Sequence, residues 1–219
     1  MKKRRLFVIV AAIVIVGTLI AVVAVWYHNY PAHRFEVVEE GVLYRSGQPD
    51  IEALATIVDT YHIRTVFNLR GATSTEPWWH AEEDFCRRNG ILHVNIAVTQ
   101  ETMDDAAVEE LIRAAADPQR RPILIHCREG RTRTGVMVAA YRIAAQGWSY
   151  EAALAEAVKG GLNPQAYPQY DEYLKSLAAR AATRPSSGLF GPRPASSRPA
   201  APGGRQLARS PDAGLDHRG

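Results

Sequence analysis

Residues 122–135 read Pro-Ile-Leu-Ile-His-Cys-Arg-Glu-Gly-Arg-Thr-Arg-Thr-Gly, and this stretch decides the fold. Its first part, 122–126, has the short apolar pattern of a buried strand, and an Ala-rich helix begins at Thr132 or Thr134 and ends near Gly147. A tight turn between a strand and a helix directs unpaired backbone N–H groups inward, and the helix N-terminus adds a partial positive charge. The stretch therefore predicts a site that binds phosphate.

Two side chains at the ends of this turn carry reactive chemistry. Cys127 opens the turn and Arg133 closes it, so that thiolate and guanidinium face one phosphate from two sides. The thiolate is the nucleophilic form, and the helix N-terminus and Arg133 are expected to lower the pKa of the Cys127 thiol. His126 is expected to order the loop, and the Thr134 hydroxyl to stabilise the thiolate as it leaves. The other loop residues are predicted to contact the phosphate: Arg128, Glu129, Gly130, Arg131 and Thr132.

Strand and helix signals alternate on both sides of this stretch, from residue 35 to residue 182. Such alternation indicates an α/β domain with a mostly parallel central sheet and helices on both of its faces. Asp50 as an N-cap, Pro77 in a first turn and Gly90 beyond a helix end help to set the helix boundaries. The expected strands are 35–38, 42–45, 63–69, 91–98 and 122–126. The expected helices end near 61, 88, 116, 147, 159 and 182; the second of them is expected to begin at Ser74 or Thr75, and the last at residue 164.

The pattern His-Cys-x5-Arg-Thr-Gly resembles the signature of the protein tyrosine phosphatase superfamily, and within it the dual-specificity branch. Segments 43–49, 65–70 and 147–153 resemble the corresponding segments of small bacterial members, so the resemblance covers roughly residues 36–178. It implies a cysteine-dependent phosphatase in which Cys127 forms a phosphocysteine that water then hydrolyses. It also implies that the reaction needs no metal and no cofactor.

The general acid is the part of the family pattern that this chain does not reproduce. The resemblance implies an Asp after the preceding strand, but Val98 and Thr99 stand where it is expected. We choose Asp104 as the candidate acid, ahead of the neighbouring Glu101 and Asp105. Acidic residues also suit the first turn of a helix, so a purely structural role is an equal alternative. Without a dedicated acid, aryl phosphates are expected to react faster than alkyl phosphates.

Basic residues near the loop bear on the substrate. Arg70 follows a strand end, from which a side chain can reach a ligand; the alternative is a surface salt bridge with Glu129 or Glu82. The resemblance implies that basic loop residues such as Arg128 and Arg131 favour highly charged head groups, as in phosphatases of inositol lipids and inositol pyrophosphates. We predict a phosphotyrosine or mixed phosphoprotein substrate first, and a phosphoinositide or inositol phosphate second.

Two other classes of function stay open. A phosphate-binding module without turnover is favoured by the missing acid, although the intact Cys127 and Arg133 argue against it. The chain has two cysteines, and a redox pair of Cys86 with Cys127 requires Cα atoms within about 7 Å of each other. The net charge of +3 gives no indication of nucleic-acid binding, and no Cys or His cluster indicates a metal site.

The N-terminal part of the chain predicts a membrane anchor. Residues 1–5 are basic, and residues 6–25 carry no charge, which is enough helix to span a hydrocarbon core of about 30 Å. With the aromatic residue Trp26 beside it, the span is predicted as a transmembrane helix over 6–27, followed by a linker at 28–34; a cleaved signal peptide is the alternative. The positive-inside rule puts the N-terminus in the cytoplasm and the catalytic domain outside it, in the periplasm of a diderm bacterium.

The C-terminal residues 183–219 are rich in Pro, Gly and Arg and hold few large apolar side chains. Such a segment cannot bury enough apolar surface to offset its ordering entropy, so a disordered tail is predicted. The catalytic domain is therefore expected at residues 35–182. With 47% hydrophobic residues in the whole chain, there is enough apolar material for one well-cored domain.

Overall fold

Five short strands form one sheet in the part of the chain that the structure describes, in the order β1-β2-β5-β3-β4. The structure is a computed structural model, and it describes residues 4, 9, 11–21, 34–99, 103 and 105–183. The strands are β1 (Glu36–Glu39), β2 (Leu43–Ser46), β3 (Thr65–Asn68), β4 (Leu92–Asn95) and β5 (Ile123–His126).

The register of the parallel strands brings three of their carboxyl ends together. Ser46 at the end of β2 and Asn68 at the end of β3 both pair with His126 at the end of β5. The edge strand β1 runs antiparallel to β2, so the sheet is mixed but mostly parallel, as predicted. In parallel sheets ligands bind beyond the carboxyl ends of the strands, and here this edge carries the Cys127 loop.

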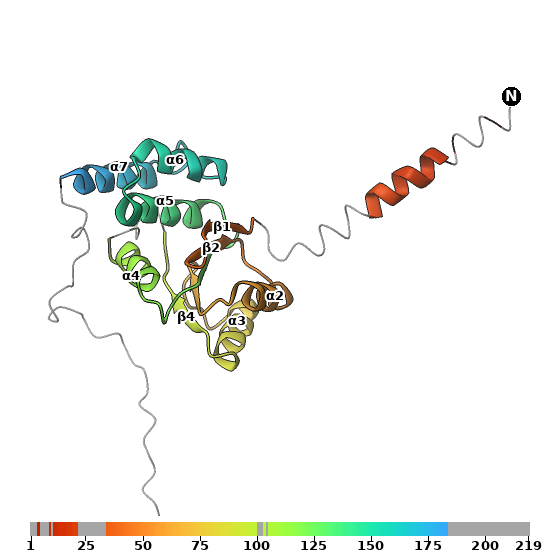
Figure 1. Ribbon diagram of the computed structural model, residues 1–219, viewed down its shortest axis with the longest axis horizontal. Coiled ribbons are helices and arrows are strands. Elements are labelled where there is room, and N and C mark those ends of the chain that lie inside the picture. The colour runs from red at the N-terminus through yellow and green to blue at the C-terminus, as the bar shows by residue number, and fades with distance from the viewer. Residues whose placement is uncertain are drawn as a thin grey trace, which may run out of the picture. The chain divides into compact units, whose positions relative to one another are not determined.

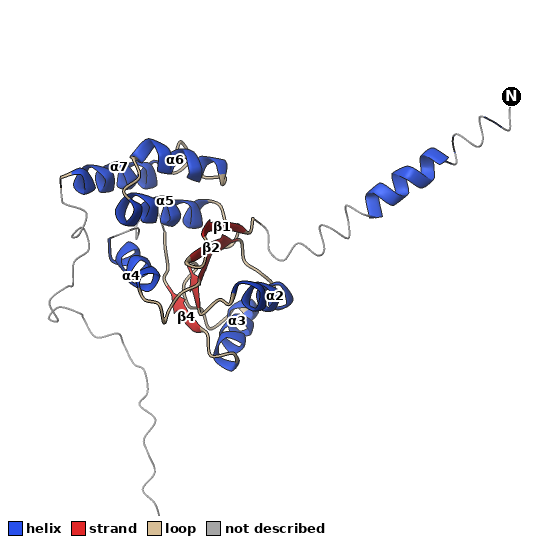
Figure 2. Ribbon diagram, in the orientation of Figure 1, coloured by secondary structure: helices blue, strands red, loops and turns tan. Residues whose placement is uncertain are grey.

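Helices cover both faces of the sheet, as Figures 1 and 2 show. Helices α2 and α3 lie on one face, and α4 to α7 gather on the other. The bounds are α2 (Ile51–Tyr61), α3 (Pro77–Arg88), α4 (Asp105–Ala116), α5 (Thr132–Gln146), α6 (Tyr150–Lys159) and α7 (Pro168–Ala182).

Helix α5 is buried on nearly all sides, because it packs against β5 and against α4, α6 and α7. Its interior positions are small or branched apolar residues, among them Val136, Ala139, Ala140 and Ile143, all of which are buried. A helix that is apolar all round belongs in a protein core. This packing fixes the N-terminus of α5, which is where the site lies.

A second core lies between the sheet and helices α2 and α3. Tyr44, Val66 and Leu124 extend from three neighbouring strands and contact Leu54 and Ile57 of α2. All five side chains are buried, and together with α5 they cover the sheet on both faces. The sheet edge that carries the site is thus held from two sides by close-packed side chains.

The predicted strands and helices between residues 35 and 182 are confirmed, but several boundaries differ: β4, for example, ends at Asn95 rather than at residue 98. The Asp50 side chain accepts a hydrogen bond from the N–H of Ala53 at 2.8 Å, as expected of the N-cap of α2. Helix α3 begins at Pro77 rather than at residue 74 or 75, and α7 begins at Pro168 rather than at 164. Proline fits the first helical position because its fixed φ is helical and it lacks an N–H that would stay unpaired there.

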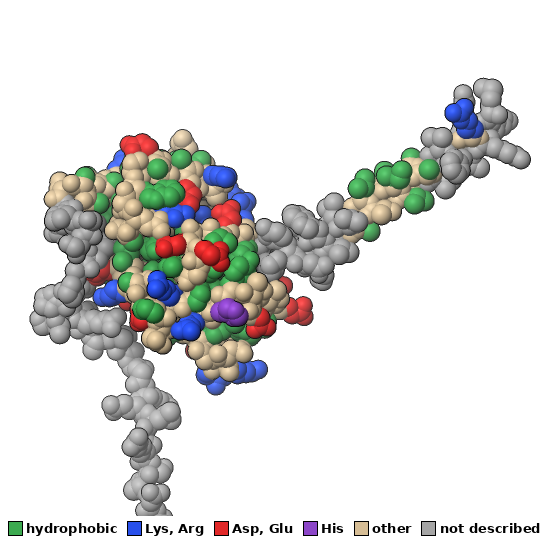
Figure 3. Space-filling view, in the orientation of Figure 1, with side chains coloured by type: hydrophobic (Ala, Val, Ile, Leu, Met, Phe, Trp, Pro, Cys, Tyr) green, Lys and Arg blue, Asp and Glu red, His purple; other side chains and the backbone are tan. Residues whose placement is uncertain are grey.

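The two ends of the chain are described only in part. Residues 11–21 of the predicted membrane span form a helix with exposed hydrophobic side chains, visible in Figure 3, and no described helix is long and apolar enough to cross a membrane. The predicted span over 6–27 is therefore not found, and most of its remaining residues lie outside the described ones. Most of the linker and the predicted tail from residue 184 onward also lie outside the described residues.

Candidate active site

The Cys127 loop runs from the end of β5 to the start of α5. His126 ends the strand, residues 127–131 form the turn, and Thr132 begins the helix. The N-cap residue Arg131 makes no side-chain hydrogen bond to the helix, so the first-turn N–H groups have no side-chain cap. An uncapped helix N-terminus at the mouth of a turn is a site for an anion.

Segment 45–49 supports the loop from its outer side. The buried Arg45 guanidinium donates to the carbonyl of Gly130 at 2.6 Å, and the Gln48 N–H donates to the carbonyl of Arg128 at 3.2 Å. With these two carbonyls bound on the outside, the loop is oriented for its N–H groups to face inward. Gly130 adopts φ +68°, and a Cβ there would lie 2.5 Å from the backbone nitrogen of Gly47, so only glycine fits.

The Cys127 thiol is buried, and its pKa lies below the ordinary value for a cysteine. Burial by itself disfavours the charged thiolate. Hydrogen bonds from the Thr134 hydroxyl and from the N–H groups of Thr134 and Glu129, together with the charge of Arg133, outweigh that effect. The loop therefore favours the nucleophilic form of the sulfur.

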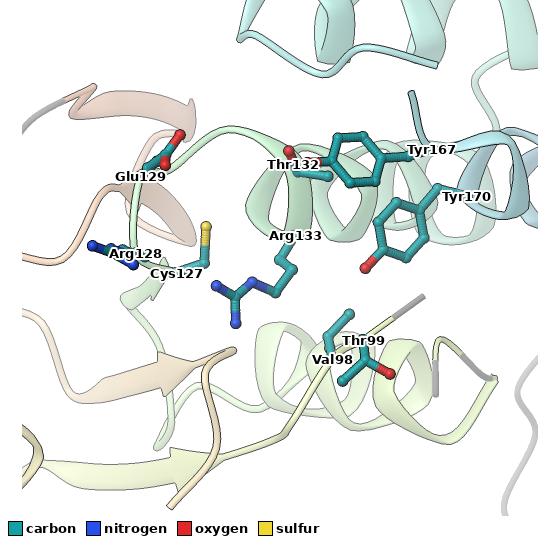
Figure 4. Close-up of a pocket in the computed structure, with 9 residues that line it drawn as sticks. All are labelled: Val98, Thr99, Cys127, Arg128, Glu129, Thr132, Arg133, Tyr167 and Tyr170. Atoms are coloured by element: carbon teal, nitrogen blue, oxygen red, sulfur yellow. The ribbon is translucent and has the colours of Figure 1, made fainter. Parts of the chain in front are cut away.

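A cavity of about 390 Å³ opens over the sulfur, with Cys127 at its base and Arg133 beside it (Figure 4). Three of the loop residues that are predicted to contact phosphate also line it: Arg128, Glu129 and Thr132. Its complete lining is Val98, Thr99, Cys127, Arg128, Glu129, Thr132, Arg133, Tyr167 and Tyr170. The Cys127 thiol, the Arg133 guanidinium and the helix N-terminus thus share one cavity, an arrangement suited to a phosphoryl group.

Two predicted contact residues in the loop have other neighbours. Gly130 packs against Ser46 and Gly47 on the outer side of the loop. Arg131 donates to the carbonyl of Gly161 at 3.3 Å and lies 3.7 Å from the Glu129 carboxylate. Neither lines the cavity; both have roles in the loop's own packing, and their phosphate contacts stay a prediction.

Arg70 is held beside the cavity. Its guanidinium donates to Oε1 of Gln48 at 3.1 Å and stacks on the ring of Trp78, 3.5 Å from the ring centre. Burial lowers the pKa of Arg70, and the positive charges of Arg133 and Arg128 lower it further, although Arg70 itself does not line the cavity. The predicted alternative of a salt bridge from Arg70 to Glu82 or Glu129 is replaced by the bond to Gln48.

Val98 and Thr99 line the cavity where the family pattern implies an acid. Asp105 begins α4, and its carboxylate accepts hydrogen bonds from Tyr173 and Arg180 at 2.9 and 2.7 Å. For Asp105 the structural alternative is therefore confirmed. Asp104 and Glu101 lie outside the described residues, so the choice of Asp104 stays a prediction.

A buried carboxylate lies behind the loop. Glu82 of α3 is 1% exposed, and it lies 3.2 Å from Nε2 of His126 and 2.9 Å from Nε2 of His93. Burial alone would raise the pKa of Glu82, but the charge and hydrogen bond of His126, and then those of His93, lower it to about 2. Gln48 donates to the same carboxylate at 2.6 Å, so Glu82 has three polar neighbours from three segments.

Sequence reasoning missed four residues around the site: Gln48, Glu82, Tyr167 and Tyr170. The two tyrosines form one wall of the cavity from the start of α7, forty residues beyond the nucleophile in the case of Tyr167. Glu82 was considered only as a partner of Arg70. The position of Glu82 among apolar residues of its helix was the one sequence signal that indicated a buried carboxylate, because the partners of Glu82 come from other segments of the chain.

The second cysteine takes no part in the site. Cys86 is buried in α3 and, like Cys127, is a free thiol. Burial and the charge of Glu82 raise the pKa of Cys86 to about 12, so its thiolate is scarce at neutral pH. No cluster of three His, Cys, Asp or Glu residues that could hold a metal occurs among the residues the structure covers.

The sheet is mostly parallel, a Cys-x5-Arg loop joins one of its strands to a helix, and the pKa of the loop's thiol is lowered. These features define the class of cysteine phosphatases of the protein tyrosine phosphatase superfamily, in its dual-specificity branch. The chain belongs to the family described as DSP-PTPase phosphatase fused to NAD+ kinase, whose pattern matches residues 18–170. The match covers the sheet, the loop and the helix that follows it.

Known proteins resemble this chain in sequence and in structure. It is 30% identical over 124 residues to the dual specificity protein phosphatase TpbA of Pseudomonas aeruginosa, covering 56% of this chain and 53% of that protein. It is 33% identical over 117 residues to an inositol diphosphatase of Oryza sativa, covering 51% and 50%. The crystal structure of TpbA superposes with a TM-score of 0.53 at 25% identity, over 69% of this chain and 92% of that one. The chain spans about half the length of the curated relatives it matches.

Proposed function

We propose that this chain hydrolyses phosphate monoesters through a phosphocysteine intermediate, without a metal. The observation that carries the proposal is that Cys127 and Arg133 line one cavity in which the loop lowers the pKa of the thiol. Family membership supports the same reaction. A phosphate-binding module would have no need for a nucleophile biased toward the thiolate, so turnover is the better reading.

The reaction follows from the positions of these groups in two displacements. The Cys127 thiolate attacks phosphorus, the bond from phosphorus to the ester oxygen breaks, and the alcohol or phenol leaves with a proton. Water then attacks the phosphocysteine, inorganic phosphate leaves, and the sulfur returns to the thiolate. Arg133 and the loop N–H groups bind the phosphoryl oxygens, and the Thr134 hydroxyl stabilises the departing thiolate in the second step.

A phosphotyrosine or mixed phosphoprotein substrate is our first choice. Tyr167 and Tyr170 make one wall of the cavity, with ring centres 6.0 Å apart, and an aromatic wall suits a phenyl ring that leads into a phosphate site. The relative TpbA is called a dual specificity protein phosphatase. An aryl phosphate also has a good leaving group, which needs little help from a general acid, and Asp104 is only a candidate for that acid in this chain.

An inositol phosphate or inositol diphosphate is the second candidate. Arg128 and Arg133 line the cavity, and their charges lower the pKa of the nearby Arg70, so the cations here attract a substrate with several phosphate groups more than one with a single phosphate. The plant relatives are called inositol diphosphatases. The Glu129 carboxylate, which lines the same cavity, offsets part of this positive charge.

A substrate panel distinguishes the two candidates. Phosphotyrosine peptides, inositol hexakisphosphate and an inositol diphosphate are offered to the full chain with EDTA and reductant, and released phosphate is measured. We expect the highest kcat/KM for phosphotyrosine. A higher value for the inositol diphosphate, with a loss in Arg128→Gln, would replace our first choice by the second, and binding of every compound without turnover would favour the phosphate-binding module.

We also propose that an N-terminal helix over residues 6–27 anchors the chain in a membrane, with the catalytic domain outside the cytoplasm. The uncharged run and the basic residues before it support this proposal. The full chain is then expected to sediment with membranes and to resist carbonate extraction, while a chain that starts at residue 35 stays in the supernatant. Recovery of the intact full chain from the supernatant would contradict the anchor.

A further inference from the structure

The buried Glu82 carboxylate joins the catalytic loop to a cation at the cavity, although it does not line the cavity itself. His126 Nε2, 3.2 Å from Oε2 of Glu82, belongs to the residue directly before the nucleophile. Gln48 Nε2 donates to the same oxygen at 2.6 Å. Gln48 then accepts from Arg70 through Oε1 at 3.1 Å. A chain of contacts therefore runs from the loop, through one carboxylate, to Arg70.

The third contact of Glu82 fixes it to the sheet. His93 of β4 approaches Oε1 of Glu82 at 2.9 Å, and its other ring nitrogen lies 3.4 Å from the amide of Asn95. A carboxylate only accepts hydrogen bonds, so the His93 nitrogen that faces Oε1 of Glu82 carries a proton, while Nε2 of His126 faces Oε2 in a contact of 3.2 Å. The charged or titratable groups around Glu82 are thus His93, His126, Arg70 through Gln48, and the neighbouring thiol of Cys86.

We propose that Glu82 is a positioning residue for the reaction: it fixes His126 behind the nucleophile and, through Gln48, holds Arg70 beside Arg133 and Arg128. A buried carboxylate is costly to a fold unless donors surround it, and apolar residues would fill the same space at lower cost. The three polar contacts of Glu82 reach His126 at the end of β5, His93 of β4 and Gln48 of segment 45–49, which all meet at the site. This inference rests on the proposed phosphatase function and adds a residue to it.

Two substitutions separate the position of Glu82 from its charge. Glu82→Gln keeps an acceptor for His126 and Gln48, and its amide can donate to His93 after a tautomer change, so kcat stays within about threefold of wild type. Glu82→Leu removes the carboxylate from all three polar contacts, so we expect kcat for p-nitrophenyl phosphate to fall about tenfold or more. Glu110→Gln is the matched control, because that carboxylate pairs with Arg113 and Arg120 away from the cavity.

Gln48→Met tests the arm that leads to Arg70. It removes the acceptor of Arg70 while His126 keeps its contact with Glu82. We expect KM for p-nitrophenyl phosphate and the inhibition constant of inorganic phosphate to rise about tenfold, with kcat unchanged. If Gln48 only stabilised the fold, its substitution would lower the melting temperature without raising KM selectively over kcat.

Several outcomes would overturn the proposal. One is a folded Glu82→Leu variant with wild-type kcat and KM. Another is an equal loss of kcat in Glu82→Gln and Glu82→Leu, which would assign the effect to the charge of Glu82. If Glu82→Leu does not fold, Gln48→Met decides, and an unchanged KM and phosphate inhibition constant reject the role. Failure of the proposed function gives a different result, because the wild type then shows no turnover. In that case the binding of inorganic phosphate is measured by the rise in melting temperature that it produces, and a comparison with Glu82→Gln and Gln48→Met shows whether these substitutions alter binding.

Discussion

Cys127→Ser is expected to abolish hydrolysis of p-nitrophenyl phosphate, lowering kcat by about 10⁴-fold or more. A serine hydroxyl has nearly the same size as the thiol, but it does not ionise near neutral pH, so the loop that favours a thiolate gains nothing from it. The measurement is the steady-state rate of the full chain with EDTA and reductant present. Wild-type activity that survives EDTA then belongs to the metal-free phosphocysteine route.

The pH dependence of kcat/KM, measured in the same assay, provides a second test of the nucleophile. Only the thiolate attacks, so the wild-type kcat/KM is expected to fall as pH drops through the lowered pKa of Cys127 and to level off above it. Cys86→Ser is the matched variant, because its thiol is buried away from the cavity and its pKa is raised. Full activity in Cys127→Ser, or loss of activity in a folded Cys86→Ser, would refute the assignment of the nucleophile.

Arg133→Lys is expected to lower kcat/KM by about 10²- to 10³-fold although the positive charge is kept. A guanidinium offers two parallel donors to phosphoryl oxygens, whereas an ammonium is a point charge on a flexible stem. Arg133 reaches the cavity from the first turn of α5, where it also favours the Cys127 thiolate. The loss is therefore expected in both kcat and the binding of orthovanadate, measured by competitive inhibition.

Arg64→Lys serves as the matched control for that substitution. Arg64 contacts the carbonyl of Pro118 at 3.3 Å and does not line the cavity, so its kcat/KM is expected to equal that of wild type. Melting temperatures of both variants show whether each has folded. A folded Arg133→Lys with wild-type kcat/KM would mean that bidentate binding by this arginine is not part of the reaction.

Local patterns in the chain predicted the elements well because each is specified by neighbouring residues. The β-branched run before Asn68 became β3, and Asp50 became the N-cap of α2. Boundaries were predicted less well: α3 begins at Pro77, two or three residues after the expected start, and β4 ends at Asn95 rather than at residue 98. The membrane span over 6–27 is the predicted element that the described residues do not show.

The sequence by itself predicted the nucleophile, the arginine for phosphate and the loop between them, since a strand, a turn over residues 127–131 and a helix are consecutive and their chemistry is local. Only the tertiary structure decided that Tyr167 and Tyr170 wall the cavity, that Arg70 is held by Gln48 and that Glu82 lies behind His126. These contacts join segments far apart in the chain, and which side chains meet across a sheet depends on register and helix packing. Neither of those can be read from the spacing of residues alone.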